Sequence, residues 1–248
     1  MTNHFDIEMD TLVSKKRWEN FEYGSHFAYI DFFRYILPVL KNTRPGRLLD
    51  IGSGSGAISI CLAKIGFRVD GIDDSPVAIA NSNMASRAML LEERVRFEQT
   101  DLIGFYPEHR YGVVLCLDRI EHTVDDEEYL TRVRDLMVED GLLILSTPLQ
   151  TGPLTKLGMS KRFDQSVGHR RRYSRNRIVG TLMRCGFNVD SWIETEGIVR
   201  NALLVNRRSR SLARYLRGAL LTRILTAIDD AAGRLFGFSK IIVISRKK

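Results

Sequence analysis

Three glycines and a carboxylate stand close together in LLDIGSGSG, residues 48–56, and their types and spacing point to chemistry. Asp50 ends an apolar run, and Gly52, Gly54 and Gly56 follow it at alternate positions. Glycine lets the backbone turn sharply and approach a ligand without a clash from Cβ. A carboxylate at such a turn repels a pyrophosphate but attracts a cation. The segment therefore predicts a backbone cradle for a ligand that carries positive charge.

The spacing of these glycines separates two kinds of ligand. Dinucleotide-binding folds carry G-x-G-x-x-G, with a later acid that contacts the ribose. Here the spacing is G-x-G-x-G, and Asp50 precedes the glycines. This order favours S-adenosylmethionine, which is cationic and zwitterionic, over a nicotinamide dinucleotide.

Two further acids follow later apolar runs. Asp73 ends the run in GIDDSP, 19 residues after Gly54, where a carboxylate can accept hydrogen bonds from both hydroxyls of a ribose. Asp101 follows the next run in EQTDL, where it can accept from an adenine amine, and Leu102 adds an apolar contact. A single acid of this kind is most often a surface or capping residue. Three of them at successive strand ends indicate one binding site.

The elements that must position these acids alternate along the chain. Runs rich in Val, Ile and Leu predict five buried strands, at 47–52, 68–73, 95–100, 111–118 and 141–148. Segments of helical composition lie between them, at 55–66, 75–91 and 125–140, and Ser75 before Pro76 is expected to cap the second of these. This alternation predicts an α/β fold with a mostly parallel sheet and helices on both faces. Such sheets bind ligands beyond the carboxyl ends of their strands, where these acids lie.

The flanking segments complete one predicted domain of residues 1–248. Its expected parts are an N-terminal helical cap (1–46, with a helix over 17–41), a cofactor-binding core (47–148), a lid-like loop (149–173), and a basic helical insertion (197–238) between the last two strands. A further helix is expected over 174–186, and strands over 187–196 and 240–247.

Composition restricts the class of protein. The chain has 248 residues, of which 44% are hydrophobic, so it can bury a sizeable core. The net charge of +7 is unevenly spread: residues 1–160 carry 17 Lys and Arg against 24 Asp and Glu, and residues 161–248 carry 20 against 6. No apolar run approaches about 18 residues, and the start lacks a signal-peptide pattern, so the sequence predicts a cytoplasmic protein. Cys61, Cys116 and Cys185 lack metal or disulfide spacing and are expected to be reduced thiols.

In these motifs the chain resembles the class I S-adenosylmethionine-dependent methyltransferases. The similar segments are LLDIGSGSG, GIDDSP, QTD, VVLCLDRIEH and GLLILSTP, within residues 47–148. The resemblance implies a Rossmann-like sheet of seven strands, the last of which runs antiparallel beside 187–196. It implies S-adenosylmethionine as the cofactor, held by the glycine turn and the strand ends: Asp50, Gly52, Ser53, Gly54, Gly56, Asp73, Asp74, Asp101, Leu102 and Leu117.

The chemistry implied is an in-line displacement at a sulfonium methyl group. The protein aligns donor and acceptor and, for a hydroxyl acceptor, removes a proton. Candidate bases are Asp118, Glu121 and His122, in CLDRIEHTVDD, together with His169. The segment resembles that of ubiquinone-biosynthesis O-methyltransferases, whose acid-x-x-Glu-His can hold a divalent cation. We expect no metal here, and a cation at Asp118, Glu121 and His122 is the alternative.

The basic segment VGHRRRYSRNR, residues 167–177, lies at the end of the lid-like loop. It is similar to a D-x-x-x-G-H-x-R-R-Y segment of uncharacterised relatives connected with lipid or glycan synthesis. We expect Arg171, Arg172 and Tyr173, together with His26, to contact the acceptor, since forked donors suit phosphate or carboxylate. The alternative is that the arginines pair with acids of the protein, and this is what we expect of the other arginines in the segment.

The acceptor class follows from several weaker observations. The turn typical of DNA amine methylation is missing after the fourth strand, where the chain reads LDRI. A basic amphipathic helix over 207–220 would suit an anionic membrane or an amphipathic substrate, although packing on the sheet would explain it equally well. We expect O-methylation of a hydrophobic or anionic metabolite or lipid-linked compound. The alternatives are a C-methyltransferase and an RNA-directed methyltransferase or binding module. The RNA alternative is disfavoured because Tyr215 is the one aromatic residue in 197–228.

Overall fold

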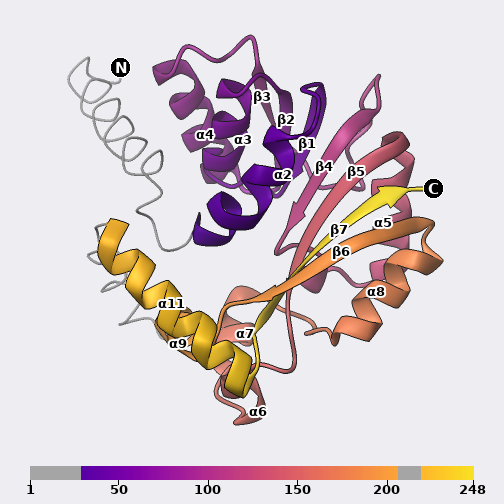
Figure 1. The fold of residues 1–248 in the computed structure, drawn as a ribbon. Helices are drawn as coiled ribbons and strands as arrows, with labels where there is room; N and C mark the ends of the chain where they lie inside the picture. The colour runs from indigo at the N-terminus through magenta and orange to yellow at the C-terminus, as the bar shows by residue number, and fades with distance from the viewer. Residues whose placement is uncertain (1–28, 206–218) are drawn as a thin grey trace. The chain divides into compact units, whose positions relative to one another are not determined.

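The computed structural model describes residues 29–205 and 219–248, and its contacts divide the chain into two compact units, residues 1–115 and 116–248. Seven strands form one sheet in the order β3-β2-β1-β4-β5-β7-β6 (Figure 1). The predicted fold class, a mostly parallel seven-stranded sheet with an antiparallel last strand, is confirmed. His26, residues 17–28 of the helix expected over 17–41, and residues 207–218 of the helix expected over 207–220 lie outside the described residues.

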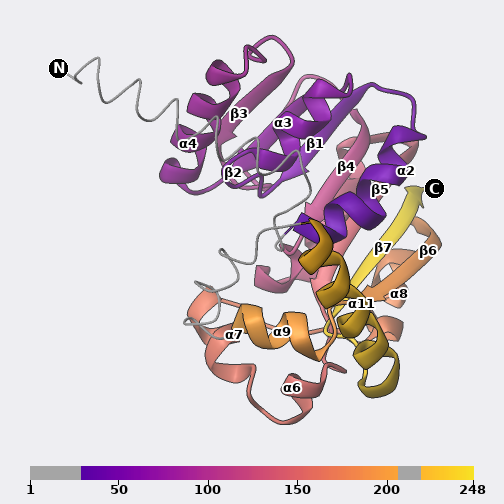
Figure 2. The same cartoon turned by 60° about the vertical axis from the view of Figure 1, so that its left-hand side comes forward.

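The first unit contains the predicted βα alternation. Its elements are η2 (Phe32–Ile36), α2 (Leu37–Lys41), β1 (Arg47–Ile51), α3 (Ala57–Lys64), β2 (Arg68–Asp73), α4 (Pro76–Ala88), β3 (Val95–Gln99) and most of β4 (Tyr111–Leu117). β2 pairs in parallel with both β1 and β3, with Asp50 opposite Gly71 and Asp73 opposite Gln99. α3 packs on β2 and α4 on β3 (Figure 2). The carboxyl ends of β1, β2 and β3 consequently lie side by side.

Local sequence explains how α4 begins. The Ser75 hydroxyl accepts a hydrogen bond from the Ala78 N–H at 3.3 Å, and Pro76 occupies the first helical position. Proline is tolerated there because the first N–H groups of a helix have no partner within the helix. The predicted cap is confirmed, and Asp73 lies two residues before the capping residue Ser75.

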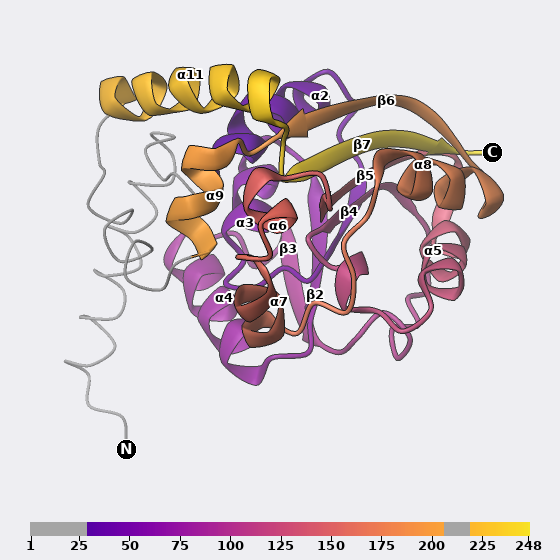
Figure 3. The same cartoon turned by 90° about the horizontal axis from the view of Figure 1, so that it is seen from below.

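The second unit contains the rest of the sheet. Its elements are η3 (Ile120–His122), α5 (Asp126–Asp135), β5 (Met137–Pro148), α6 (Pro153–Lys156), α7 (Lys161–Val167), α8 (Arg175–Arg184), β6 (Phe187–Thr195), α9 (Ile198–Val205), α11 (Ala219–Phe236) and β7 (Lys240–Lys247). β7 runs antiparallel to both β5 and β6 and lies between them (Figure 1). α8 packs against β6 and α5 (Figure 3).

Two expectations about secondary structure need correction. The helix expected over 125–140 ends at Asp135, and Met137 already begins β5. The pairing of β5 with β7 covers residues 142–148, and before it the Lys247 side chain contacts the Met137 carbonyl and forms an ion pair with Glu139. The segment 149–173, expected as a loop, contains the short helices α6 and α7.

Among the residues that the structure describes, no helix has both the length and the hydropathy needed to cross a membrane. The cytoplasmic location stays a prediction. The three cysteines are free thiols, of which Cys116 and Cys185 are buried and Cys61 is half-buried.

Candidate functional site

The glycine turn of the first unit has the backbone that its sequence predicts. Gly52, Gly54 and Gly56 have φ angles of 75°, 54° and 77°, which lie in the left-handed region that favours glycine. The Ile72 carbonyl at the end of β2 accepts the N–H groups of Gly52 at 2.8 Å and Ser53 at 3.0 Å. A Cβ added at Gly54 would meet nothing within 4 Å. The turn is therefore tied to β2 while the space above Gly54 stays open.

The Asp73 carboxylate forms hydrogen bonds that stabilise this turn. One carboxylate oxygen accepts the Gly54 N–H and the other accepts the Ser75 N–H, both at 3.0 Å. Each carboxylate oxygen has two lone pairs, so both can still accept from a ribose hydroxyl. Asp73 thus links the glycine turn to the start of α4, a role that the sequence pattern alone did not indicate.

Asp50 is a buried acid at the carboxyl end of β1. Its side chain accepts a short hydrogen bond of 2.6 Å from the Ser59 hydroxyl. Burial raises the pKa of Asp50 to about 6, the bond from Ser59 opposes that rise, and the charge of Asp73 adds to it. A cationic ligand would favour the ionised form. The residues present therefore fit the ammonium group of S-adenosylmethionine.

The remaining predicted cofactor contacts lie at the same strand ends or just beyond them. Asp101 is exposed, and its carboxylate accepts the Gly104 N–H at 2.7 Å, while Leu102 is buried. Asp74 is exposed, and the Ser53 hydroxyl is buried without a hydrogen-bond partner among the described residues. Leu117 ends β4 and belongs to the second unit. The cofactor roles of these residues stay predictions.

In the second unit, Glu121, His122 and His169 form a group that we call the Glu121 cluster. One ligand atom from each lies within 4.8 Å of the other two. Glu121 is fully buried and accepts the Thr147 hydroxyl at 3.0 Å. Burial, with the nearby charge of Asp118, raises the pKa of Glu121 to about 8. Burial and the neighbouring His169 lower the pKa of His122. Three of the four predicted catalytic side chains thus lie together.

Asp118, the fourth predicted catalytic residue, is oriented differently. Its backbone has a φ of 53°, which is uncommon for a residue with a side chain. The carboxylate accepts the Ser146 hydroxyl at 2.9 Å and forms an ion pair with Lys240. Asp118 is therefore not part of the Glu121 cluster, and the alternative metal set of Asp118, Glu121 and His122 is not the one that the described residues bring together.

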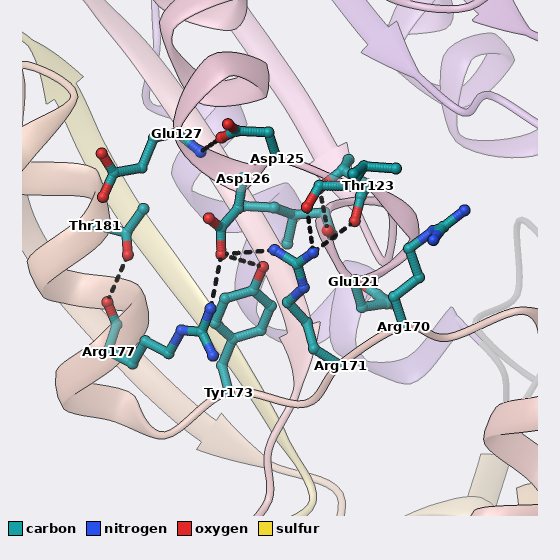
Figure 4. A network of polar contacts seen from close by, with 12 residues as sticks. Glu121, Thr123, Asp125, Asp126, Glu127, Arg170, Arg171, Tyr173, Arg177 and Thr181 are labelled. Atoms are coloured by element: carbon teal, nitrogen blue, oxygen red, sulfur yellow. Dashed lines mark hydrogen bonds and ion pairs between the residues drawn. The ribbon is translucent and has the colours of Figure 1, made fainter.

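Tyr173 and four of the arginines of segment 167–177 contact acids of the same unit, whereas Arg170 donates to the His122 carbonyl; Figure 4 shows Arg171, Tyr173 and Arg177 around Asp126. Asp126 accepts the Tyr173 hydroxyl at 3.0 Å and pairs with Arg171 at 3.0 Å and Arg177 at 3.3 Å. Burial alone would raise the pKa of Asp126, but the bonds from Tyr173 and Arg171 outweigh it and lower the pKa. Tyr173 is fully buried. The alternative considered above, pairing with acids of the protein, describes Arg171 and Arg177, and acceptor contact by Arg171 and Tyr173 stays a prediction.

Arg172 supports the Glu121 cluster indirectly. It binds Asp164 with two parallel hydrogen bonds of 2.9 and 2.7 Å. Asp164 in turn lies 2.9 Å from Nδ1 of His169, whose Nε2 lies 3.8 Å from Glu121. A chain of contacts therefore runs from Arg172 through Asp164 and His169 to Glu121. The contact of Arg172 with the acceptor stays a prediction.

Sequence reasoning missed a polar pocket of about 410 Å³ in the first unit, lined in part by Arg47, Asp70, His109 and Tyr111. Asp70 accepts the Tyr111 hydroxyl at 2.8 Å, and His109 contacts both Asp70 at 3.0 Å and Arg47 at 3.1 Å. Residues 70–72 of β2, with Arg96 and Glu98 of β3, also line it, so the pocket lies along these strands and does not belong to the glycine turn. No motif could reveal it, because His109 is 39 residues from Asp70 and 62 from Arg47.

Comparison with known proteins adds to this geometry. The family described as "Methyltransferase domain" matches residues 24–191. The mitochondrial "Ubiquinone biosynthesis O-methyltransferase" of Schizosaccharomyces pombe is 27% identical over 143 residues, which cover 55% of this chain and 52% of that protein. The protein of the same name from Cereibacter sphaeroides is 36% identical over 101 residues, covering 41% of this chain and 40% of that protein. The chain thus spans about half the length, or less, of these relatives.

Solved structures with a similar fold include methyltransferases of low sequence identity. Magnesium protoporphyrin IX methyltransferase from Synechocystis PCC 6803, solved with bound SAH, has a TM-score of 0.59 and 19% identity, covering 90% of this chain and 84% of that one. Phosphoethanolamine N-methyltransferase 2 from Haemonchus contortus, in complex with S-adenosyl-L-methionine, has a TM-score of 0.62 and 17% identity, covering 86% and 51%. These likenesses concern the fold.

Proposed function

Since the chain belongs to the class I S-adenosylmethionine-dependent methyltransferases, we propose that it methylates a hydroxyl oxygen of a small hydrophobic or anionic acceptor. S-adenosylmethionine is the cofactor of this class, and it supplies a methyl group on a sulfonium that is already an excellent leaving group. The protein therefore has to hold the cofactor, align the acceptor and take up the hydroxyl proton.

We assign cofactor binding to the first unit. Asp50 pairs with the ammonium of the methionine part, and the open space above Gly54 allows the ligand to approach the backbone. Asp73 accepts from the ribose hydroxyls while it keeps the turn in place, and Asp101 accepts from the adenine amine. The buried Asp50, which has the hydrogen bond from Ser59 to its carboxylate, is the observation that supports a cationic ligand most directly.

We assign removal of the acceptor proton to the Glu121 cluster of the second unit. The observation that carries this assignment is the chain of contacts from Arg172 through Asp164 and His169 to the buried Glu121. Such a chain holds an imidazole in one orientation beside a carboxylate, as an acid–base group requires. The O-methyltransferase names of the relatives support oxygen as the acceptor atom.

Product analysis tests the acceptor atom. The protein is incubated with methyl-labelled S-adenosylmethionine and a panel of phenols, catechols and prenylated phenols, and the products are examined by NMR. We expect label in methoxy groups. Label on ring carbon or on nitrogen would overturn O-methylation, and failure to bind S-adenosylmethionine in calorimetry would overturn the cofactor assignment.

We also propose that the second unit makes peripheral contact with anionic membranes. On α11, Ile224, Ile228 and Leu235 are 49%, 52% and 78% exposed, and their spacing places them on one face of the helix. Arg223 and Arg234 stand next to them in the sequence and are also exposed. An exposed apolar face with flanking arginines is typical of helices that lie in the interface of anionic bilayers.

A further inference from the structure

The Glu121 cluster joins side chains that are far apart in the sequence. Glu121 and His122 lie in η3, whereas His169 follows α7, 48 residues after Glu121. The two imidazole rings are 4.9 Å apart between centroids and meet edge to face at 78°. With the Glu121 carboxylate they bring two nitrogen ligands and one oxygen ligand within 4.8 Å of one another.

In each of the two histidines, Nδ1 contacts an acceptor of the protein, and this leaves Nε2 available to bind a metal ion. Nδ1 of His169 lies 2.9 Å from a carboxylate oxygen of Asp164, and Nδ1 of His122 lies 3.2 Å from the Gly168 carbonyl. Both partners are acceptors, so they place the proton of the neutral ring on Nδ1 and leave a lone pair on Nε2. Histidines that bind metal ions in proteins are almost always oriented by such contacts.

The orienting acid is itself held in place. Asp164 receives two hydrogen bonds from Arg172, whose side chain is 8% exposed. A bidentate contact of this kind fixes the plane of the carboxylate. The orientation of the His169 ring is therefore set by two successive layers of contacts.

Glu121 supplies an observation that is independent of the histidines. Its side chain is fully buried, and one oxygen accepts the Thr147 hydroxyl at 3.0 Å. The other oxygen is buried without a hydrogen-bond partner among the described residues and lies 3.8 Å from Nε2 of His169. A buried carboxylate oxygen without a donor is costly, and a metal ion is one of the partners that stabilises it.

We propose that Glu121, His122 and His169 bind a divalent transition-metal ion, with Zn²⁺ as the first candidate. Two imidazoles and one carboxylate suit Zn²⁺, and three protein ligands leave a coordination position open, as in catalytic zinc sites. Mg²⁺ prefers oxygen ligands and fits this set poorly. The set differs from the acid-x-x-Glu-His arrangement considered in the sequence, because the Asp118 carboxylate is taken by Ser146 and Lys240.

The role of the ion rests on the proposed function, whereas its binding does not. With the ion bound, the imidazoles would serve as its ligands in place of accepting the proton themselves, and a hydroxyl at the open position would have a lower pKa and release its proton to water, which is what O-methylation needs. Metal binding can be measured without acceptor or cofactor, so failure of the metal site and failure of the proposed function are distinguishable.

The test uses the full chain after dialysis against a chelator. Zn²⁺ is titrated by calorimetry, and Co²⁺ is titrated by its visible absorption, which reports nitrogen and oxygen coordination. We expect one ion per chain, with Mg²⁺ binding far more weakly. His169→Gln and His122→Gln should lose the Co²⁺ spectrum, and Asp164→Asn should lower Zn²⁺ affinity by roughly 10- to 100-fold.

Asp118→Asn is the matched control, since it removes the neighbouring acid of the alternative set. It should bind Zn²⁺ as the wild type does. Circular dichroism and S-adenosylmethionine affinity check that each variant is folded. The proposal is overturned when wild-type protein binds neither Zn²⁺ nor Co²⁺ at one equivalent, or when Asp118→Asn loses the ion and His169→Gln keeps it.

Discussion

Asp50 carries a charge that its surroundings disfavour. It is 3% exposed, and burial raises its pKa to about 6 against the opposing hydrogen bond from Ser59. The negative charge of Asp73 adds to the rise. The ammonium group of the cofactor would lower this pKa, because an opposite charge favours the ionised form. Cofactor binding and ionisation of Asp50 should therefore be linked.

This linkage predicts a pH dependence of cofactor affinity. Below a pH of about 6, Asp50 in the free protein is protonated and must release its proton before it pairs with the ammonium. Affinity for S-adenosylmethionine should fall as the pH falls, to about a tenth at pH 5 of its value at pH 7. Calorimetry between pH 5 and pH 8 measures it. Asp50→Asn should bind weakly with little change over this range, and a wild-type affinity independent of pH would contradict the role of Asp50.

Gly54 and Gly56 look equivalent in the sequence but have different surroundings. A Cβ at Gly56 would lie 2.6 Å from Phe97 and 2.8 Å from Ser82, whereas a Cβ at Gly54 would meet nothing within 4 Å. Both glycines have positive φ angles, 54° at Gly54 and 77° at Gly56, so any substitution strains the backbone. Of the two positions, only Gly56 is one where an added Cβ would clash with neighbouring side chains.

We therefore expect different defects from the two alanine substitutions. Gly56→Ala should lower the free energy of unfolding by about 2 kcal/mol or more, from overpacking added to backbone strain. Gly54→Ala should cost about 1 kcal/mol of stability but weaken S-adenosylmethionine binding, since its Cβ projects into the open space. Urea unfolding and calorimetry separate the two effects. Equal losses of stability would show that the contacts of Gly56 do not matter.

At the level of elements, Asp126 ties the start of α5 to the segment before α8. It accepts the hydroxyl of the buried Tyr173 and pairs with Arg171 and Arg177 (Figure 4). The side chain of Asp126 is 13% exposed, so water screens its contacts with Tyr173 and Arg171 little, whereas the Arg177 side chain is 52% exposed. The next residue, Glu127, pairs with Arg184 in a contact where both side chains are more than half exposed. Adjacent acids thus form a shielded network and an exposed ion pair.

Asp126→Asn should destabilise the protein by roughly 1–3 kcal/mol, because buried donors lose a charged partner. Since the pKa of Asp126 is lowered in the folded chain, its contribution is complete above the pKa of the unfolded chain and is lost as the pH falls through the folded value. Denaturant unfolding at neutral and acidic pH measures both effects. Glu127→Gln is the matched control, and it should change stability by less than about 1 kcal/mol. Equal effects of the two substitutions would contradict this account.

Residues 1–160 are acidic overall and residues 161–248 are basic overall. Residues 1–160 carry 17 Lys and Arg against 24 Asp and Glu, and residues 161–248 carry 20 against 6. The cofactor acids belong to the first part, and α11 with its exposed Ile224, Ile228 and Leu235 belongs to the second. Charge and exposed apolar surface therefore occur together in the part that we propose to contact membranes.

We expect the protein to co-sediment with vesicles that contain phosphatidylglycerol at low salt, and to be released at high salt, because exposed charges are screened. Pure phosphatidylcholine vesicles should bind it weakly. Ile224→Ser combined with Ile228→Ser should reduce binding, whereas Leu90→Ser, at an exposed apolar position of the first unit, should leave it unchanged. Absence of binding to anionic vesicles at low salt would reject the membrane proposal.

The sequence by itself determined the strands, the cofactor motif and the fold class. All seven predicted strands exist, and in most of them a run of Val, Ile and Leu is buried while the residues between the strands favour turns or helices. The left-handed glycines of the turn and the cap at Ser75 also follow from local chemistry, since each depends on residues a few positions apart. Local rules were enough wherever the partners are neighbours in the chain.

Tertiary structure alone decided which acids and histidines meet. Spacing placed Asp118, Glu121 and His122 together, but the turn after β4 directs Asp118 to Ser146 and Lys240, and His169 takes the place beside Glu121. The Lys247 side chain of β7 likewise contacts the Met137 carbonyl at the start of β5, although the two residues are 110 positions apart. Contacts between distant segments depend on how elements pack, and a pattern of residue types along the chain does not contain that information.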